Sequence, residues 1–365
     1  MPSVPIAKFP MEEKTLLIAE PLPNGSTRTW SNIFPVGKGA GETWERIRLM
    51  IHVALGVGVQ TFPVEGGVYN FIRNVRLETS DGETIVDCPG TALYILNRWM
   101  EHHTPWHTPV VAAAAQYDAI LDIPLGFSFL RKPEDGYLDS GAYSALRLTI
   151  TTGGYAAGAV PGDLGVSNAA GTQVATFDLS VIRTKAGFFN NASVKPLFVP
   201  YIKYIGSRVP SNGVQYFDIE SANDLALFGF MVAHGSVARH PFDHVTAASG
   251  LSAETDGITD ITFGDNIIPN ILDRKMIDSF RNERHRDMNA VFPLADAGSY
   301  TLGNIPTISL TGKYFHLFVK DGSVYGAYPT GNKSQIKLSW NGGAGGTAQA
   351  DGLVFGFRTR RKLFM

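Results

Sequence analysis

The residues best suited to metal chemistry are histidines, and a first group lies in the stretch 101–107, EHHTPWH. His102 and His103 are adjacent, so on a helix their side chains would point about 100° apart. A Thr-Pro pair then breaks any helix before His107. Because a zinc site needs ligands that converge on one point, we interpret these three histidines as structural or surface residues.

A second group lies in the loop-like stretch HGSVARHPFDH and comprises His234, His240, Asp243 and His244. Imidazole and carboxylate groups in one loop weakly resemble a metal-binding loop. A polar surface loop is the interpretation that we favour. A metalloenzyme of the cupin type that uses one of the two histidine groups remains an alternative, which metal analysis would test.

Other reactive residue types occur in contexts that need no catalysis. The pairs Glu134-Asp135 and Asp256 with Asp260 lie in stretches rich in glycine and proline, where acidic residues commonly form turns. The single cysteine, Cys88, is expected to be a small buried hydrophobic residue. The sequence contains no nucleophile elbow of the form Gly-x-Ser-x-Gly.

Two glycine-rich tracts, 153–165 and 341–352, lack the lysine and the following helix of a phosphate-binding loop. We expect them to be long loops between neighbouring strands, at the same place in each half of the chain. We therefore assign no catalytic, cofactor-binding or metal-binding residue and no cofactor, and we expect a protein that is not an enzyme.

The end of the sequence is basic and carries Arg358, Arg360, Arg361 and Lys362. Such a tail can contact nucleic acid or anionic lipid. It can equally be a solvated strand edge whose charges prevent unwanted strand pairing. The residues alone favour neither role over the other.

The composition indicates a large folded chain of balanced charge. Its 365 residues are 44% hydrophobic, and 39 glycines with 21 prolines provide for many turns. The net charge of −2 argues against a general polyanion-binding protein, and a single cysteine excludes an intrachain disulfide. The N-terminus does not read as a secretory signal, and the apolar segment 47–62 is too short to span a bilayer.

Alternation of apolar and polar residues is the main local pattern, and it predicts strands. In residues 45–55, ERIRLMIHVAL, every second side chain is apolar. Residues 74–86 contain two such runs around Asp81-Gly82, which is typical of a hairpin. Residues 145–152 and 175–184 repeat the pattern, and further short runs follow, so we predict an all-β chain built of sandwiches.

Two predicted helices interrupt the strands. Residues 91–103 follow a Pro-Gly pair, with Thr91 as the expected N-cap. Residues 270–288 form the second helix, because Ile271, Met276, Ile277 and Phe280 make an apolar stripe. The interruption thus recurs after about 180 residues.

This recurrence points to an internal repeat. Residues 182–185 align with 357–360 at an offset of 175, and 146–154 resemble 336–343 at an offset of 190. Both halves present these features in the same order. We therefore predict a duplicated β-sandwich with its seam near residues 187–198.

Six segments carry a resemblance to a known family. They are 74–100, 121–129, 144–150, 198–209, 273–288 and 352–363. In content and order they are similar to the double jelly-roll major capsid proteins of the adenovirus and tectivirus type of viral lineage. The resemblance covers most of the chain and is one of architecture and short segments.

The resemblance implies an all-β fold of two tandem eight-stranded jelly rolls with a few short helices. Residues 1–14 would be an extended N-terminal arm, because Pro2, Pro5 and Pro10 disfavour a helix there. The stretches 153–173 and 235–257 would form outward-facing towers. The jelly rolls would comprise residues 15–190 and 191–365.

The function implied is that of a major capsid protein. It would form homotrimers that act as pseudo-hexagonal capsomers of an icosahedral virion, as in a bacteriophage with an internal membrane. Partners would be neighbouring capsomers, minor capsid or penton proteins, internal membrane proteins and lipid on the inner face. No specific nucleic-acid recognition is expected, and assembly would take place in the host cytoplasm.

The alternative is a secreted carbohydrate-active or carbohydrate-binding protein made of two jelly rolls. Its tryptophans, among them Trp44, Trp99, Trp106 and Trp340, could stack on sugars from a concave sheet face. Tryptophans of this kind more often belong to the core. Secretion and oligomeric state distinguish the two hypotheses.

Overall fold

The structure is a computed structural model, and it describes most of the chain. The described residues are 11–37, 42–54, 67–101, 106, 116–154, 174–184, 198–208, 213–236, 258–264, 270–273, 313–319, 322–331, 335–340 and 348–359.

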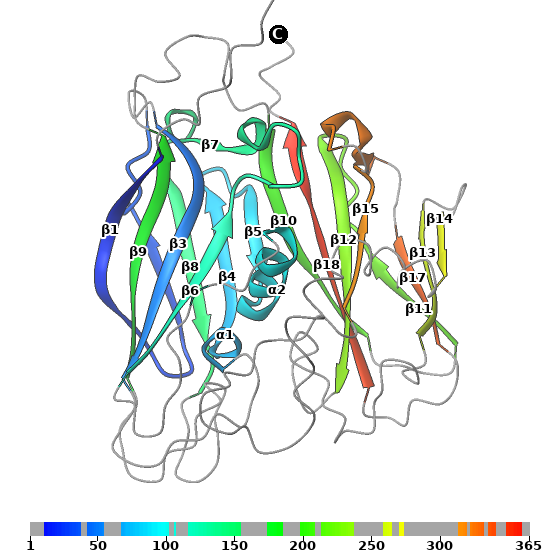
Figure 1. Cartoon of the computed structure of the whole chain (residues 1–365), viewed down its shortest axis with the longest axis horizontal. Helices are drawn as coiled ribbons and strands as arrows, with labels where there is room; N and C mark the ends of the chain where they lie inside the picture. Colours follow the sequence, from blue (N-terminus) through cyan, green and yellow to red (C-terminus); the bar gives the residue numbers. More distant parts are fainter. Residues whose placement is uncertain are drawn as a thin grey trace, which may run out of the picture.

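The first half of the chain folds into two facing antiparallel sheets, with strand orders β1-β9-β3-β6 and β2-β8-β4-β5 (Figure 1). A short strand, β7, adds to β3. The bounds are β1 Met11–Leu22, β2 Thr27–Ser31, β3 Thr43–Ala54, β4 Ile72–Thr79, β5 Thr84–Cys88, β6 Gln116–Pro124, β7 Leu138–Asp139, β8 Leu146–Thr152 and β9 Val174–Thr184.

The second half repeats this arrangement with strand orders β10-β18-β12-β15 and β11-β17-β13-β14, and a short strand, β16, adds to β12. The bounds are β10 Phe198–Arg208, β11 Gly213–Asp218, β12 Leu225–Ser236, β13 Ile258–Gly264, β14 Asn270–Asp273, β15 Lys313–Leu317, β16 Tyr328–Pro329, β17 Gln335–Trp340 and β18 Ala348–Thr359.

Each strand of the first repeat therefore has a counterpart nine strands later, from β1 and β10 to β9 and β18. The two sequence matches fall on counterpart strands, β8 with β17 and β9 with β18. The prediction of two tandem jelly rolls is confirmed. The chain passes from one repeat to the other within residues 185–197, which lie outside the described residues.

The strands follow the sequence pattern that predicted them. In β3, Ile47, Leu49, Ile51 and Val53 are fully or almost fully buried between the two sheets of the first repeat. The intervening side chains lie on the outer face, because successive residues of a strand point to opposite sides. The predicted hairpin is β4 and β5, and its turn uses Gly82 at a φ of +80°.

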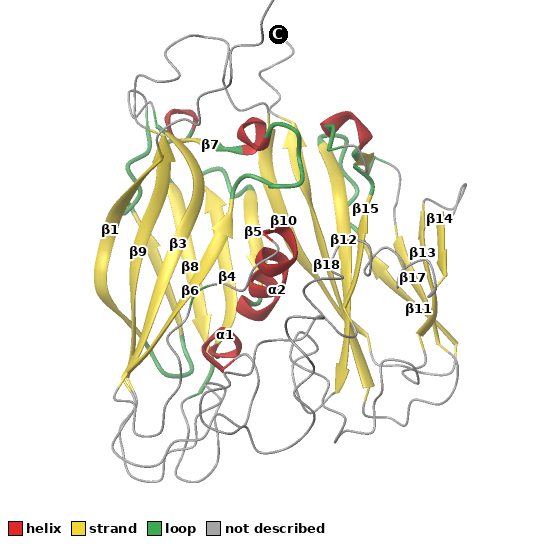
Figure 2. Ribbon diagram, viewed as in Figure 1, coloured by secondary structure: helices red, strands yellow, loops and turns green. Residues whose placement is uncertain are grey.

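Helix α2 (Figure 2) confirms the first predicted helix. It comprises Gly90–Glu101 and so begins one residue earlier than expected. Thr91 is therefore not the N-cap but lies buried in the first turn. A Cβ atom on Gly90 would lie 2.7 Å from the carbonyl oxygen of Tyr69. Glycine thus lets α2 begin close to the short helix α1, Gly67–Phe71.

The second predicted helix is wrong at its start, because Asn270–Asp273 is strand β14, paired with β13. The rest of that prediction, residues 274–288, lies outside the described residues. A four-residue segment has too few residues for helical periodicity to decide its structure, and a neighbouring strand supplies its hydrogen bonds instead.

Other predictions fall largely on residues that are not described. Residues 1–10 of the arm, 155–173 of the first tower and 237–257 of the second lie outside the described residues. Residues 11–14 of the predicted arm belong to β1, where Met11 pairs with Thr184.

The two repeats are joined by strand pairing. Strand β10 lies parallel to β5, with Ile202 opposite Val86 and Lys203 opposite Asp87. Sheet β2-β8-β4-β5 thereby continues into β10-β18-β12-β15 across the molecule (Figure 1). Helix α2 lies in the middle of the molecule, where β5 meets β10 (Figure 2).

Candidate functional site

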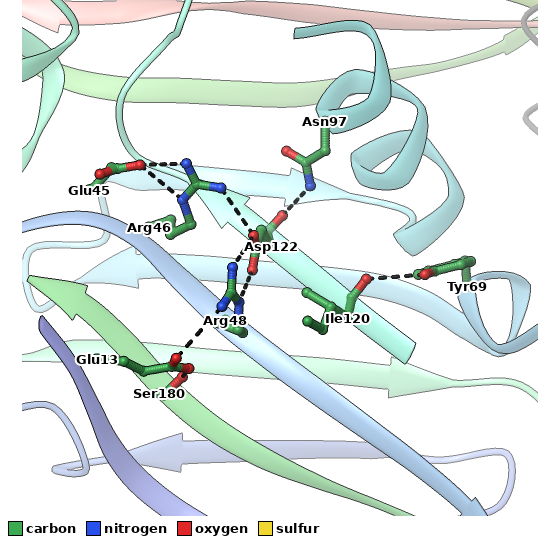
Figure 3. Close-up of polar contacts among 9 residues, drawn as sticks. All are labelled: Glu13, Glu45, Arg46, Arg48, Tyr69, Asn97, Ile120, Asp122 and Ser180. Atoms are coloured by element: carbon green, nitrogen blue, oxygen red, sulfur yellow. Dashed lines mark hydrogen bonds and ion pairs between the residues drawn. The ribbon is translucent and has the colours of Figure 1, made fainter. Parts of the chain in front are cut away.

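The outer face of sheet β1-β9-β3-β6 carries a network of ion pairs centred on Asp122 of β6 (Figure 3). Arg48 binds this carboxylate through two nitrogens, Nε to Oδ1 at 2.9 Å and Nη2 to Oδ2 at 3.1 Å. Arg46 Nη1 lies 3.2 Å from Oδ2. Paired hydrogen bonds from a guanidinium to a carboxylate are among the stronger polar contacts in proteins.

The network extends from β3 across β9 to the edge strand β1. Glu13 of β1 lies 3.6 Å from Arg48 and accepts a hydrogen bond from Ser180 of β9. The hydrogen bond to Asp122 raises the pKa of Arg48 despite the desolvation of the guanidinium. Four adjacent strands thus share one set of charges.

His52 of β3 continues the charged face toward the other end of the sheet. Its Nδ1 atom lies 2.8 Å from Asp118 of β6, and its Nε2 atom lies 3.3 Å from Asp178 of β9. The carboxylates of the face are thus held by side chains of neighbouring strands.

The junction between the repeats is filled by aromatic side chains. Trp99 of α2 stacks on Phe315 of β15, with ring centroids 4.6 Å apart and planes within 2°. Trp99 also contacts Phe355 of β18 at 5.9 Å. Phe127, which follows β6, meets Phe228 of β12 edge-to-face at 5.1 Å. Aromatic pairs of this kind stabilise a contact beyond the area that they bury.

One edge of the junction is polar and is organised by Glu220. Its carboxylate accepts from the Tyr201 hydroxyl at 3.0 Å and from Lys203 Nζ at 3.3 Å, and it pairs with Arg358. Burial acts to raise the pKa of Glu220, but the hydrogen bond and charge of Arg358 outweigh it, so the pKa is lowered. Arg358 also lies 3.9 Å from Glu83 of the first repeat.

Arg358 has a counterpart in the first repeat, 175 residues earlier, as the sequence alignment predicted. Arg183 near the end of β9 pairs with Glu42, which directly precedes β3. Arg358 near the end of β18 lies 3.5 Å from Asp224, which directly precedes β12. The duplication thus preserves an internal ion pair as well as strand order.

This position corrects both hypotheses for the basic C-terminus as far as Arg358 is concerned. Its side chain is only 13% exposed, so it is neither a solvated edge charge nor free to contact nucleic acid or lipid. Arg360, Arg361 and Lys362 lie outside the described residues.

The histidine groups fall mostly outside the described residues. This applies to His102, His103 and His107 of the first group and to His240, Asp243 and His244 of the second, whereas the backbone of His234 belongs to β12. Within the part of the chain that the structure describes, no three His, Cys, Asp or Glu side chains are grouped so as to hold a metal ion.

The acidic pairs and the cysteine occupy ordinary structural positions. Glu134 and Asp135 form a 3-10 turn, and burial raises the pKa of Asp135. Asp260 lies in β13, and Asp256 is outside the described residues. Cys88 is fully buried, and burial raises its pKa well above the usual value, so its thiol is a poor nucleophile.

The tryptophans confirm the expectation of core residues in two cases. Trp44 and Trp99 are buried, whereas Trp106 is half exposed. The backbone of Trp340 belongs to β17, and its side chain is outside the description. Among the described residues, no helix is long and apolar enough to cross a membrane.

The junction aromatics were not predicted from the sequence, although a signal was present. The runs LALFGFMV of β12 and GLVFGF of β18 are nearly continuous in apolar residues. A strand that is buried on both faces reads in this way, whereas a strand with one solvated face alternates. The runs therefore indicated a second buried face in the second repeat.

Comparison with known proteins finds relatives in structure but not in sequence. No protein-family model matches the chain, and no curated protein matches it. The STIV major capsid protein is similar over 97% of this chain and 98% of its own, at a TM-score of 0.62 and 12% identity.

Two further structures agree. The major capsid protein of bacteriophage PM2 matches over 96% of this chain and 99% of its own, with a TM-score of 0.56 and 12% identity. The Faustovirus major capsid protein matches over 98% and 91%, with a TM-score of 0.56 and 8% identity. At such identities the likeness is one of fold, and this chain has the double jelly-roll fold that these capsid proteins share.

Proposed function

We propose that this chain is a viral major capsid protein whose function is to assemble with copies of itself into the virion shell. One observation carries the proposal: the fold matches capsid proteins over almost the whole length of both chains. The densely packed junction and the charged outer face suit a rigid building block better than an enzyme.

The capsomer is proposed to be a homotrimer. Three chains with two similar jelly rolls each present six nearly equivalent lobes, and such a body fills a hexagonal position in an icosahedral lattice. The strand-by-strand duplication supports this proposal, because a pseudo-hexagon requires the two repeats to have the same architecture.

The remaining parts of the proposal rest on the resemblance noted from the sequence. The chain is located in the virion shell, over an internal membrane, and is assembled in the host cytoplasm. Its partners are neighbouring capsomers, minor capsid or penton proteins, internal membrane proteins and lipid at the inner face. The near-neutral net charge of −2 supports the absence of specific nucleic-acid recognition.

Native mass in solution, measured by size-exclusion chromatography with light scattering, tests the proposal. We expect a stable species near three times the chain mass of 39.5 kDa, without added ligand. Electron microscopy of that species should show tiles with six lobes. A monomer over the whole accessible concentration range would contradict the proposal.

Two of the four tryptophans named for the carbohydrate-binding alternative do not support it. Trp44 and Trp99 are buried and therefore cannot stack on a sugar. Binding of the purified protein to a glycan array would revive that alternative.

A further inference from the structure

The junction between the repeats is a template for a contact between chains. Within one chain, β5 of the first repeat lies parallel to β10 of the second. The counterpart of β10 is β1, and the counterpart of β5 is β14. Among the described residues β1 pairs only with β9 and β14 only with β13, so each ends its sheet. They lie at opposite ends of the molecule (Figure 1).

The strand register identifies the counterparts residue by residue. Ile202 of β10 lies opposite Phe355, and Thr15 of β1 lies opposite Ser180. Because Ser180 and Phe355 differ by the repeat offset of 175, Thr15 corresponds to Ile202.

The same reasoning assigns Leu272 of β14 as the counterpart of Val86 of β5. The matching cross-strand rows are Val86–Leu77–Leu148 and Leu272–Ile261–Leu338. The sequences agree locally, since Ile-Val-Asp in β5 becomes Ile-Leu-Asp in β14. The pair Ile202–Val86 inside one chain therefore predicts the pair Thr15–Leu272 between two chains.

The sheet faces beside these strands differ in chemistry. In the second repeat the row Leu317–Gly229–Phe355 crosses the outer face, and Phe355 lies against Trp99 of α2. The corresponding row of the first repeat is Asp122–Arg48–Ser180. The apolar face is covered within the chain, whereas the matching face is the ion-pair network of Figure 3.

The sequences that follow β5 and β14 also differ in charge, as the two sheet faces do. Residues 90–101, which form α2, contain two charged residues, Arg98 and Glu101. Residues 274–288, which lie outside the described residues, contain five arginines or lysines and three acidic residues. The charged face bears five carboxylates, of Glu13, Glu45, Asp118, Asp122 and Asp178, against Arg46, Arg48 and His52.

We propose that a second copy of this chain docks on the charged face of sheet β1-β9-β3-β6, with its β14 parallel to β1 so that Leu272 lies opposite Thr15. This inference rests on the proposed function and names the surfaces through which subunits meet. The contact joins two different surfaces, and a head-to-tail contact of this kind closes into a ring when its rotation is a simple fraction of a turn. A polar interface also keeps the free subunit soluble before assembly.

Engineered cysteines test the register directly, because the native Cys88 is buried. Thr15→Cys and Leu272→Cys are made as separate proteins, mixed and mildly oxidised. We expect a disulfide-linked dimer from the mixture and from neither protein alone, since neighbouring strands lie within disulfide reach. The double variant should give covalent trimers. Thr29→Cys, exposed on the edge strand β2 of the opposite sheet, replaces Thr15→Cys as a control and should not link.

A charge reversal tests the face without depending on the fold of β14. Glu13→Lys should weaken self-association about tenfold or more at low salt. The substitution places a positive charge on the face that would receive the basic segment 274–288 of the second copy. Asp81→Lys, in the exposed β4–β5 turn, changes the net charge equally and should leave association unaltered. The difference should shrink in high salt.

The possible failures are distinguishable. The proposed interface is wrong if trimers form normally, no Thr15–Leu272 disulfide links them, and Glu13→Lys does not weaken their association. That result would not contradict the capsid function. A wild-type chain that stays monomeric overturns both.

Discussion

At the scale of single residues, the most informative side chain is Arg358. It lies at the end of β18 and is surrounded by Glu220, Asp224 and Glu83. In the sequence, Arg358 is one of several basic residues near the C-terminus, and its neighbours along the chain do not distinguish it from Arg360 or Arg361. Its burial follows from contacts with residues that are more than 130 positions away in the sequence.

Replacing Arg358 by methionine should therefore destabilise the fold. The substitution keeps most of the side-chain volume but leaves the partly buried carboxylates of Glu220 and Asp224 without their cation. We expect the free energy of unfolding to fall by about 2 kcal/mol, less than for a fully buried pair, because both carboxylates are partly exposed to solvent. Urea denaturation followed by circular dichroism measures it.

Arg147→Met is the matched control, since Arg147 pairs with Glu78 but is 57% exposed. Glu78 is buried but keeps its ion pair with Arg76, so losing the exposed Arg147 should cost less than about 1 kcal/mol. Equal losses for the two variants would contradict the structural role assigned to Arg358.

The lowered pKa of Glu220 predicts how stability depends on pH. The folded state holds this carboxyl ionised below its ordinary pKa of 4.5, so the unfolded state binds the proton more readily. The stabilising contribution is therefore fully present above that pH and is lost as the pH falls through the folded value. Glu220→Gln should flatten this part of the curve of unfolding free energy against pH.

Asp81→Asn, in the exposed hairpin turn, serves as the control for this measurement. At acid pH, the unfolding free energy of this variant should depend on pH as that of the wild type does. A Glu220→Gln variant whose unfolding free energy has an unchanged slope below pH 4.5 would show that another group governs acid unfolding.

At the scale of elements, α2 is the helix that contacts both repeats. Its sequence, GTALYILNRWME, is apolar on nearly every side, and its described side chains are buried. A helix that is apolar all round must be covered on all sides. The first repeat covers one side of α2, and Phe315 and Phe355 of the second repeat cover Trp99.

Trp99→Ala should consequently weaken the attachment of the two repeats. Removing a buried tryptophan costs about 3–5 kcal/mol of stability. We expect the loss to appear as easier cleavage between the repeats in limited proteolysis, as well as in the free energy of unfolding.

Tyr325→Ala removes an aromatic side chain that is 94% exposed, and it should change neither measurement. If Trp99→Ala left the proteolysis pattern unaltered, the aromatic junction would not be what holds the repeats together.

At the scale of the whole molecule, one continuous sheet and one shared core join the jelly rolls. The larger hydrophobic cluster contains residues of both repeats, from Leu22 to Phe357. Strand β10 completes its pairing only when β5 of the first repeat is in place. The second repeat alone would expose the apolar face that α2 covers.

We therefore expect the free chain to unfold in a single calorimetric transition. Cooperative units are defined by shared packing rather than by sequence length. The calorimetric and van't Hoff enthalpies should agree for the wild type, and Trp99→Ala should broaden or split the peak. Two resolved transitions in the wild type would contradict a shared core.

The sequence alone predicted the parts of this architecture that depend on local pattern. Alternation in β3 and the Asp-Gly turn between β4 and β5 require only that apolar residues face inward and that turns tolerate a positive φ. The Arg183 and Arg358 matches revealed the duplication, because related positions keep related residues.

Only the tertiary structure decided which surfaces meet. The parallel pairing of β5 with β10, the burial of Arg358 and the strand at Asn270–Asp273 depend on partners far away in the sequence. Local periodicity indicates which side chains of a strand face the core, but it does not indicate which other strand pairs with that strand. Strand partners are selected by the total packing of both sheets, so only the fold showed that the apolar outer face of the second repeat is covered by α2 of the first.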